Sequence, residues 1–596
     1  MYQTFEVTAR PEQGPPRLKA LREQMTAAAL DGFIIPRADA HQGEYVAARD
    51  ARLAWLTGFT GSAGFCVALR DVAGVFIDGR YRTQVKAQVA DVYSPVPWPE
   101  TTMAEWLRAQ MPDGGRVGFD PWLHTVDQIA QAEKALAGSG VELVQCENLV
   151  DTIWADQPAP PMEPAKVHPL EFAGESHEAK RARLAKSLMD AGETAALITL
   201  PDSICWLLNI RGADIERNPV VHGFAILHSD GGVDLFSEPS KYDGMAPHLG
   251  GDIRLHAPDA FLAAVAALKG PVRIDTSTVP QIVADSLGAA ARPGAEPCAL
   301  PKACKNGAEI EGAAQAHLRD GAAMVEMLCW LDAQKPGTLT ETQVVSKLEG
   351  FRRADNALQD VSFETIAGTG PNGAIMHYRV TEETDSVLED GHLIVLDSGG
   401  QYLDGTTDIT RTIAIGTPPH EAAQAFTRVL AGMIAMSRLR WPKGLAGAHI
   451  EAIGRMPLWL AGQDFDHGLG HGVGAYLSVH EGPQRLSRVS NIPLEPGMIL
   501  SNEPGYYREG AFGIRIENLL VVQTAPALSG GDAHREMLDW RTLAFAPIDR
   551  RLIVPELLDP AALEWLNSYH AEVKTKIGPR LSEAAKQWLD TATAPL

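Results

Sequence analysis

Four acidic residues and one histidine in the second half of the chain are residue types that bind divalent metals. Asp397 ends the apolar run LIVLD, and Asp408 follows a glycine-rich segment. His471, Glu503 and Glu517 lie further along, each beside glycines or on a β-rich run. Carboxylates with one imidazole suit Mn²⁺, Mg²⁺, Co²⁺ or Zn²⁺ better than a thiolate site would. Four carboxylates carry more charge than one divalent ion neutralises, which favours two metals bridged by carboxylates.

The stretch from Leu393 to Thr412 predicts how two of these residues come together. Its sequence, LIVLDSGGQYLDGTTDITRT, contains glycine and Asp-Gly signals typical of a turn between two strands. We therefore expect a β-hairpin that points Asp397 and Asp408 into one cavity, where two carboxylates repel each other unless a cation or proton lies between them. The alternative interpretation is that both are ordinary turn or capping residues.

Three further histidines and an arginine lie in or near the same segments. His377 ends the glycine-rich segment SFETIAGTGPNGAIMHY, while His467 and His480 lie on either side of the proposed histidine ligand. Arg515 precedes Glu517 by two residues, and on a buried strand both side chains would share one face. There the arginine could hold a ligand carboxylate in place. The alternative interpretations are structural histidines and an exposed strand arginine.

The order Asp, Asp, His, Glu, Glu in these contexts resembles the pita-bread metallopeptidases, which include methionine aminopeptidase, prolidase and aminopeptidase P. The chain is most similar to the long, three-domain cytosolic type of aminopeptidase P (Xaa-Pro aminopeptidase). The resemblance implies two divalent ions, Mn²⁺ by family habit with Zn²⁺ or Co²⁺ as alternatives, and a hydroxide bridging them as nucleophile. It implies five metal ligands: Asp397, Asp408, His471, Glu503 and Glu517.

The same resemblance assigns roles to residues that do not bind metal. Glu503 would transfer a proton as well as bind metal, and His377 and His480 would bind the scissile carbonyl or amide and stabilise the intermediate. His467 matches a position credited with shuttling protons or supporting the ligands. Arg80, in the motif DGRY, would contribute to substrate binding from the first domain.

The 596 residues are too many for one ordinary domain. Helical and strand patterns at Arg17–Met25 and Gly32–Pro36 return in weaker form at Arg183–Met189 and Ala195–Leu200, which predicts a divergent tandem repeat of one α/β domain. The alternative is that any two α/β domains look alike at this level. The Pro-rich stretch Gln157–Pro164 is typical of a linker.

We predict an α/β (α+β) protein with two creatinase-like N-terminal domains and a C-terminal pita-bread domain. The predicted ranges are 1–156, 157–304 and 305–596, with a helical extension from about residue 545. A long amphipathic helix is expected to open the third range, at Asn306–Leu331. The resemblance also implies a homodimer.

Charge and composition exclude several classes of protein. The formal net charge of −23 argues against nucleic-acid binding and against anionic membranes. No apolar run approaches the roughly 18 residues that span a bilayer, and the N-terminal stretch MYQTFEVTARPEQGPP lacks the apolar core of a signal sequence. The six cysteines are scattered without a CxxC pair, which fits a reducing compartment. We expect a cytoplasmic protein without disulfides.

The predicted function is hydrolysis of the N-terminal Xaa-Pro bond of peptides by a metal-dependent exopeptidase. Prolidase is the nearest alternative, since it shares the ligands but cleaves only dipeptides and has a single leading domain. A non-catalytic pita-bread protein that binds peptides is the alternative from a different class. Such relatives lose metal ligands, whereas all five are present in this sequence.

Overall fold

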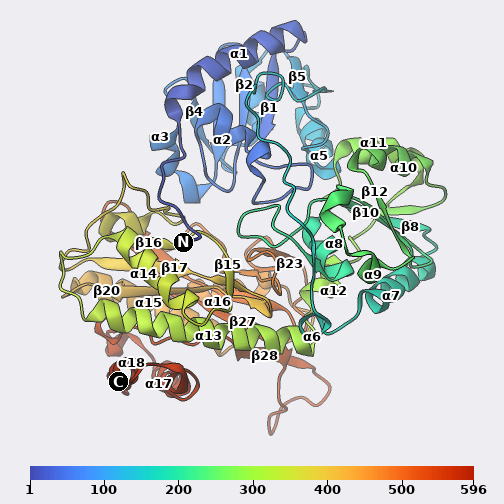
Figure 1. Ribbon diagram of the computed structural model, residues 1–596. Coiled ribbons are helices and arrows are strands. Elements are labelled where there is room, and N and C mark those ends of the chain that lie inside the picture. The colour runs from blue at the N-terminus through green and yellow to red at the C-terminus, as the bar shows by residue number, and fades with distance from the viewer. The chain divides into compact units, whose positions relative to one another are not determined.

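The computed structural model describes residues 1–596, which form two compact units (Figure 1). The C-terminal unit joins Met1–Val7, Glu171–Gly174 and Leu300–Leu596, and the N-terminal unit joins Thr8–Leu170 and Glu175–Ala299. All six cysteines are free. None of the helices combines the length and the apolar character needed to cross a bilayer.

The N-terminal unit contains two six-stranded sheets with the same connectivity, β4-β3-β2-β1-β5-β6 and β12-β11-β10-β8-β13-β14. In each sheet three consecutive strands pair antiparallel and the remaining pairs are parallel. The first sheet contains β1 (Gly32–Pro36), β2 (Phe65–Leu69), β3 (Ala73–Ile77), β4 (Ser94–Pro97), β5 (Gly115–Phe119) and β6 (Val141–Gln145). The second contains β8 (Ala195–Ile198), β10 (Phe224–His228), β11 (Val233–Phe236), β12 (Ile253–His256), β13 (Val272–Ile274) and β14 (Ala291–Pro293).

The helices repeat along with the strands. A long helix precedes the first strand of each sheet, α1 (Gly14–Ala27) and α7 (His177–Asp190), and a short one follows it, α2 (Arg52–Thr57) and α8 (Pro201–Leu208). Leu18, Leu21 and Met25 are buried along one side of α1, as the helical spacing of apolar residues predicts. The matching order of strands and helices is the arrangement that a duplicated α/β domain produces.

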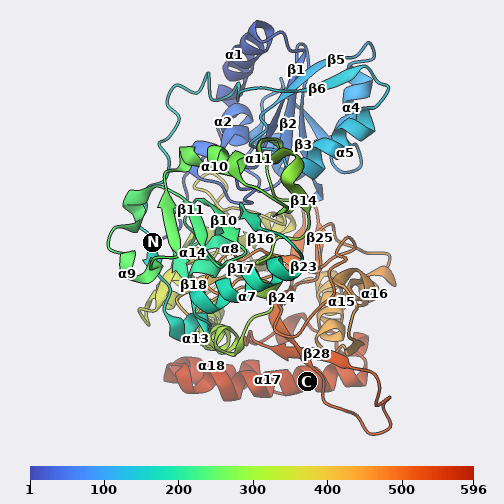
Figure 2. The same ribbon diagram turned by 90° about the vertical axis from the view of Figure 1, so that its right-hand side faces the viewer.

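Antiparallel sheets flanked by long helices form the C-terminal unit (Figure 2). Its larger sheet has the order β21-β28-β27-β24-β22-β23, and a smaller one has the order β16-β17-β20. The helices are α13 (Gly307–Asp332), α14 (Glu341–Arg353), α15 (His420–Ser437), α16 (Gly447–Trp459), α17 (Pro560–Ile577) and α18 (Glu583–Ala592). The strands are β16 (Ile366–Thr369), β17 (Leu393–Ser398), β20 (Ile409–Ala414), β21 (Trp441–Pro442), β22 (Gly470–Gly472), β23 (Glu481–Leu486), β24 (Ile499–Asn502), β27 (Asn518–Thr524) and β28 (Met537–Thr542).

The predicted hairpin is present, but its turn is wider than expected. β17 pairs antiparallel with β20, so that Asp397 lies opposite Thr410 and Ser398 opposite Ile409. The connection contains a second pair of antiparallel strands, β18 (Gly400–Tyr402) and β19 (Gly405–Thr406), and the tight turn between these two strands consists of Leu403 and Asp404. Asp408 is the residue immediately before β20.

The continuous strand expected across Arg515 and Glu517 was a wrong prediction. β26 (Phe512–Arg515) pairs with β25 (Gly505–Arg508) and ends at Arg515, and β27 begins only at Asn518. Between them the Glu517 N–H donates to the carbonyl of Thr410, at 3.1 Å. The backbone changes partners at this point, because it leaves the β25–β26 ribbon and joins β20 and the larger sheet.

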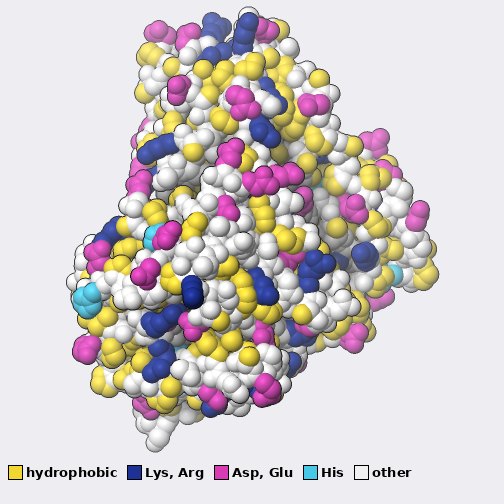
Figure 3. Space-filling view, turned by 60° about the vertical axis from the view of Figure 1, so that its left-hand side comes forward, with side chains coloured by type: hydrophobic (Ala, Val, Ile, Leu, Met, Phe, Trp, Pro, Cys, Tyr) yellow, Lys and Arg dark blue, Asp and Glu magenta, His cyan; other side chains and the backbone are white.

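The C-terminal helices α17 and α18 are part of the main core. Leu566, Val573 and Ile577 on α17 are completely buried, and the two helices lie together at one edge of the C-terminal unit (Figures 1 and 2). The Tyr569 hydroxyl lies 2.8 Å from the guanidinium of Arg411 on β20. The extension therefore supports the strand that follows Asp408. On the face drawn in Figure 3, acidic, basic and apolar side chains are interspersed.

Candidate metal centre

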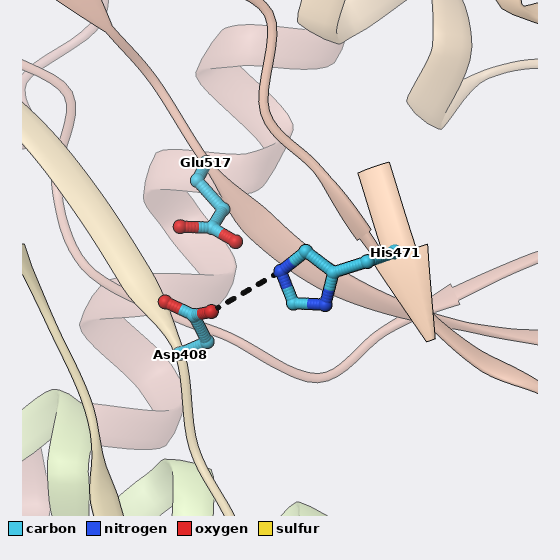
Figure 4. Close-up of side chains that lie close together, drawn as sticks. All are labelled: Asp408, His471 and Glu517. Atoms are coloured by element: carbon cyan, nitrogen blue, oxygen red, sulfur yellow. Dashed lines mark ion pairs between the residues drawn. The ribbon is translucent and has the colours of Figure 1, made fainter. Parts of the chain in front are cut away.

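Four carboxylates and one imidazole converge inside the C-terminal unit. We call Asp397, Asp408, Glu503 and Glu517 the acid cluster; three are buried and Glu503 is partly buried. His471 Nε2 lies 3.5 Å from Asp408 Oδ2 and 3.4 Å from Glu503 Oε1. Figure 4 shows the side chains of Asp408, His471 and Glu517 pointing toward one another, and their ligand atoms lie within 4.8 Å of each other. The structure thus brings together the segments that contain the five predicted ligands.

The donor atoms at this centre fit divalent cations. His471 Nδ1 lies 2.9 Å from the carbonyl of Gly472, an arrangement that orients the ring and leaves Nε2 facing the carboxylates. Asp397 Oδ1 and Glu517 Oε1 are buried and have no hydrogen-bond partner. Buried carboxylate oxygens without a donor are costly, so these two atoms are well placed to bind metal.

Electrostatic repulsion inside the acid cluster also favours the binding of cations. Burial, followed by the charges of Asp397 and Glu503, raises the pKa of Asp408 well above its ordinary value. Burial, followed by Asp408 and Glu503, does the same to the pKa of Glu517. Burial also raises the pKa of Glu503 despite the nearby His471. Mutual repulsion of this kind is what bound cations relieve.

Arg515 is the cation that directly contacts the acid cluster. Its Nη2 and Nε donate to Asp397 Oδ2 at 2.6 and 3.0 Å, and Nη1 donates to the carbonyl of Met376 at 3.1 Å and to the Tyr507 hydroxyl at 2.7 Å. Burial works against its charge, but Tyr507, Asp397 and Glu503 together raise the pKa of Arg515 well above the ordinary value. The guanidinium stays charged and orients Asp397.

The three predicted histidines lie near the acid cluster in different ways. The ring of His480 packs edge-on against His471, with centroids 4.3 Å apart. His467 Nε2 lies 2.9 Å from the Tyr507 hydroxyl, which links it to Arg515. His377 is partly buried and directly follows Met376, whose carbonyl binds Arg515. Their roles stay predictions.

Arg80 belongs to the N-terminal unit. It lies in the short helix η3 (Gly79–Tyr81), and its Nη2 contacts Asp78 Oδ2 at 2.6 Å. Its guanidinium lies over the ring of Tyr81, 5.3 Å from the centroid. Burial alone would lower the pKa of Arg80, but the hydrogen bonds to Asp78 raise it. The substrate-binding role of Arg80 also stays a prediction.

Sequence reasoning missed several residues that hold the ligands. The Thr410 hydroxyl donates to Glu517 Oε2 at 2.8 Å. The Ser501 hydroxyl donates to Glu503 Oε1 at 3.0 Å and accepts the His471 N–H at 2.9 Å. Ser501 lies two residues before Glu503 on a strand-like run, so the period of two could have identified it. Tyr507 gave no such signal beyond its presence in the segment LSNEPGYY.

Four stretches of the chain match known families. Residues 311–524 match metallopeptidase family M24, and residues 536–596 match the C-terminal region of peptidase M24. Residues 17–153 and 156–309 each match the creatinase/prolidase N-terminal domain. The fold is therefore two creatinase-like α/β domains followed by a pita-bread domain. The domain boundaries expected from the sequence stay a prediction.

Several relatives are similar over nearly the whole chain. Aminopeptidase P2 of Arabidopsis thaliana is 39% identical, over 95% of this chain and 86% of its own length. A probable Xaa-Pro aminopeptidase P of Aspergillus fumigatus is 38% identical, over 97% of this chain and 92% of its own. The crystal structure of an X-prolyl aminopeptidase from Caenorhabditis elegans, described as a cytosolic enzyme with a di-nuclear active site, superposes with a TM-score of 0.93 at 31% identity, covering 98% of this chain and 100% of that one.

Proposed function

Since this chain belongs to the aminopeptidase P family of M24 metallopeptidases, we propose that it removes the N-terminal residue of peptides whose second residue is proline. The observation that carries this function is the acid cluster. Its four carboxylates lie together with His471, and two of their buried oxygens, Asp397 Oδ1 and Glu517 Oε1, have no hydrogen-bond partner. A site built only for structure would balance those charges with protein groups. The enzyme is a metal-dependent Xaa-Pro aminopeptidase.

Two divalent ions would be held by Asp397, Asp408, His471, Glu503 and Glu517. The choice of two ions is supported by the charge of the acid cluster and by the di-nuclear site of the C. elegans relative. Bound metal would activate water and neutralise negative charge on the peptide carbonyl. We propose Mn²⁺ as the native metal, because oxygen-rich donor sets suit it, with Zn²⁺ and Co²⁺ as alternatives.

The protein groups around the ligands would supply proton transfer and substrate binding. Glu503 is held by Ser501 and His471, and as a carboxylate beside the bound metals it would take up a proton and pass it to the leaving nitrogen. His480 and His377 would hydrogen-bond the scissile peptide. His467, in contact with Tyr507, would keep the Arg515 side of the site ordered or carry protons.

Arg80 and the cellular compartment extend the proposed function beyond the acid cluster. Arg80 would bind the substrate from the first domain, and its ion pair with Asp78 would fix the orientation of the guanidinium. The C. elegans relative is described as cytosolic, and we propose the same compartment for this chain. The proposed preference for proline at the second position rests on the similarity to the aminopeptidase P relatives.

We also propose that the enzyme is a homodimer. Large apolar side chains are exposed on the end of α16 and on the loop after β23, and we call them the apolar patch: Met456 (51% exposed), Trp459 (43%), Leu460 (83%), Val489 (80%) and Ile492 (37%). Arg488, beside Val489, lies 5.6 Å from the Trp459 ring, so the loop adjoins the helix. Exposed apolar groups of this size favour an interface.

Sedimentation velocity tests the dimer. Trp459→Glu is expected to give a monomer, because it places a charge inside the buried contact. Leu528→Glu is the matched control, since Leu528 is exposed (63%) outside the apolar patch. A monomeric wild type, or a dimeric Trp459→Glu variant, would contradict the proposal.

Peptide hydrolysis tests the enzymatic function directly. Metal-stripped protein is assayed with and without Mn²⁺ on an Xaa-Pro-Yaa tripeptide, the matching Xaa-Pro dipeptide and an Xaa-Ala-Yaa control. We expect metal-dependent cleavage of the Xaa-Pro-Yaa peptide alone. Cleavage confined to the dipeptide would identify a prolidase, and no cleavage with any metal would favour the non-catalytic peptide-binding alternative.

A further inference from the structure

The buried carboxylate of Glu341, which neither binds metal nor transfers a proton in the proposed reaction, holds the segment that contains His377. Glu341 is the first residue of α14, and its side chain is completely buried. Its Oε1 accepts the N–H of Thr369 at 2.6 Å, and its Oε2 accepts the N–H of Ser386 at 3.2 Å. These two donors belong to separate stretches of backbone, so the carboxylate joins them.

Two side chains on either side of His377 donate to the same carboxylate. The amide of Asn372 lies 3.1 Å from each oxygen of Glu341, and the Tyr378 hydroxyl lies 2.7 Å from Oε2. All four groups are donors, which offsets part of the cost of burying the carboxylate. The N-terminus of α14 adds a further favourable field for negative charge. Glu341 thus fixes both ends of the segment 372–378.

The opposite side of this segment is held by the metal centre. The carbonyl of Met376 accepts Arg515 Nη1 at 3.1 Å, and Arg515 in turn binds Asp397. The short helix η7 (Gly370–Ala374) also packs closely on β26, since a Cβ at Gly513 would lie 1.6 Å from the carbonyl oxygen of Gly373. The segment therefore lies between Glu341 and Arg515, with little room to shift.

We propose that Glu341 is a positioning residue, which fixes the segment 372–378 so that His377 meets the scissile peptide. This inference rests on the proposed function, because His377 has its substrate role there. Glu341 does not touch substrate or metal in this scheme. Its effect on the reaction passes through Asn372 and Tyr378 to the histidine between them.

The test begins with Glu341→Gln and a matched control. The substitution keeps the size but places an amide donor among four donors, so the segment is expected to loosen. We expect kcat/KM for an Xaa-Pro-Yaa tripeptide to fall by about 10–100-fold, the usual range for residues that orient the groups in direct contact with metal or substrate. Glu349→Gln is the control on the same helix; Glu349 is also buried but binds the N–H of Tyr2. Its kcat/KM is expected to stay near that of the wild type.

A double-mutant cycle with His377→Ala separates positioning from a general loss of structure. If Glu341 acts through His377, Glu341→Gln is expected to lower kcat/KM by less than about threefold when His377 is already absent. A merely structural role would give the same loss in both backgrounds. Bound metal, measured by mass spectrometry, is expected to be unchanged in every variant, because Glu341 contacts no ligand.

A second variant covers the case in which Glu341→Gln does not fold, as judged by circular dichroism. Tyr378→Phe removes one donor to Glu341 and keeps the ring, and it is expected to lower kcat/KM several-fold with the same dependence on His377. Equal activity of Glu341→Gln and Glu349→Gln, or equal losses with and without His377, would overturn the inference while the wild type remains active. A wild type that cleaves no Xaa-Pro peptide would overturn the proposed function and this inference with it.

Discussion

Two buried charge clusters meet on strand β17, and they are balanced in different ways. Asp397 points into the acid cluster, where the direct cationic partner is Arg515. The next residue, Ser398, accepts Arg352 Nη2 at 3.0 Å on the other face of the strand. There Arg352 pairs with Asp320 at 2.6 and 3.0 Å, and the Tyr402 hydroxyl completes the contacts of Asp320 at 2.9 Å. We call this group the Asp320 pair.

The difference teaches what marks a metal site among buried charges. In the Asp320 pair one cation meets one anion with good geometry, so protein groups balance the charge, although Arg352 Nη1 is buried without a hydrogen-bond partner. In the acid cluster four carboxylates face one guanidinium and one imidazole, and oxygens of Asp397 and Glu517 have no donor. Both clusters are buried and both lie near glycines in the sequence. Charge balance, which only the structure displays, separates the two.

The largest expected effect is loss of activity from the acid cluster. Asp408→Ala or Glu517→Ala should lower hydrolysis of an Xaa-Pro-Yaa tripeptide by about 10³-fold or more, because the bound metal is lost. Circular dichroism should show that the fold is retained. Full activity in either variant, measured with saturating Mn²⁺, would contradict the assignment of the ligands.

Stability should respond with opposite signs in the two clusters. In metal-free protein, Glu517→Gln removes a carboxyl group whose ionised form is disfavoured by burial and by the neighbouring carboxylates, and it should raise the free energy of unfolding. Asp320→Asn leaves Arg352 buried without its anion and should lower it by about 3–5 kcal/mol. Urea unfolding followed by fluorescence checks both. Two destabilised variants would show that the acid cluster is balanced without metal.

Metal removal should affect only the acid cluster. Mn²⁺ at about 100 times its dissociation constant should stabilise the wild type by about 2.7 kcal/mol per ion, and chelation should remove that gain. The Asp320→Asn variant should keep the full gain, whereas Asp408→Ala should lose it. Thermal unfolding with and without chelator measures the difference, and an equal response in all three proteins would contradict the comparison.

Glu341 offers an intermediate case, a buried carboxylate among neutral donors. Burial, only partly offset by hydrogen bonds from Thr369, Tyr378 and Asn372, raises the pKa of Glu341 to about 7 from an ordinary 4.5. Between these values the folded protein holds a proton that the unfolded chain has lost. Its contribution to stability is therefore present below pH 4.5 and is lost as pH rises through 7, at no more than about 1.4 kcal/mol per pH unit.

Unfolding measured from pH 5 to 8 checks this slope. The wild type should lose more stability across the range than Glu341→Gln, which cannot titrate at this position. Glu349→Gln serves as control and should follow the wild type. Parallel curves for wild type and Glu341→Gln would show that burial does not shift this carboxyl group.

The sequence predicted the parts of the structure that depend on local pattern. The duplicated α/β order and the hairpin carrying Asp397 follow from helical and strand periodicity, which neighbouring residues determine. The contact of Arg515 with Asp397 spans 118 residues, and no spacing rule selects Asp397 over Glu517 as its partner. The break in the strand before Glu517 could not be predicted either, because it depends on a hydrogen bond to Thr410, which is distant in the sequence. Glu341 was missed because a single glutamate at a helix start resembles many surface residues.

The alternation along β17 has a consequence for how this chain can change over time. Asp397 and Ser398 are consecutive residues that serve opposite faces, and their pairing with Thr410 and Ile409 fixes the register. Insertion or deletion of a single residue in this strand would exchange the two faces, bury serine among the carboxylates and bring aspartate to Arg352. Point substitutions are tolerable in principle, but a change in strand length would disrupt both clusters at once. The length of β17 should therefore be among the least variable features of its descendants.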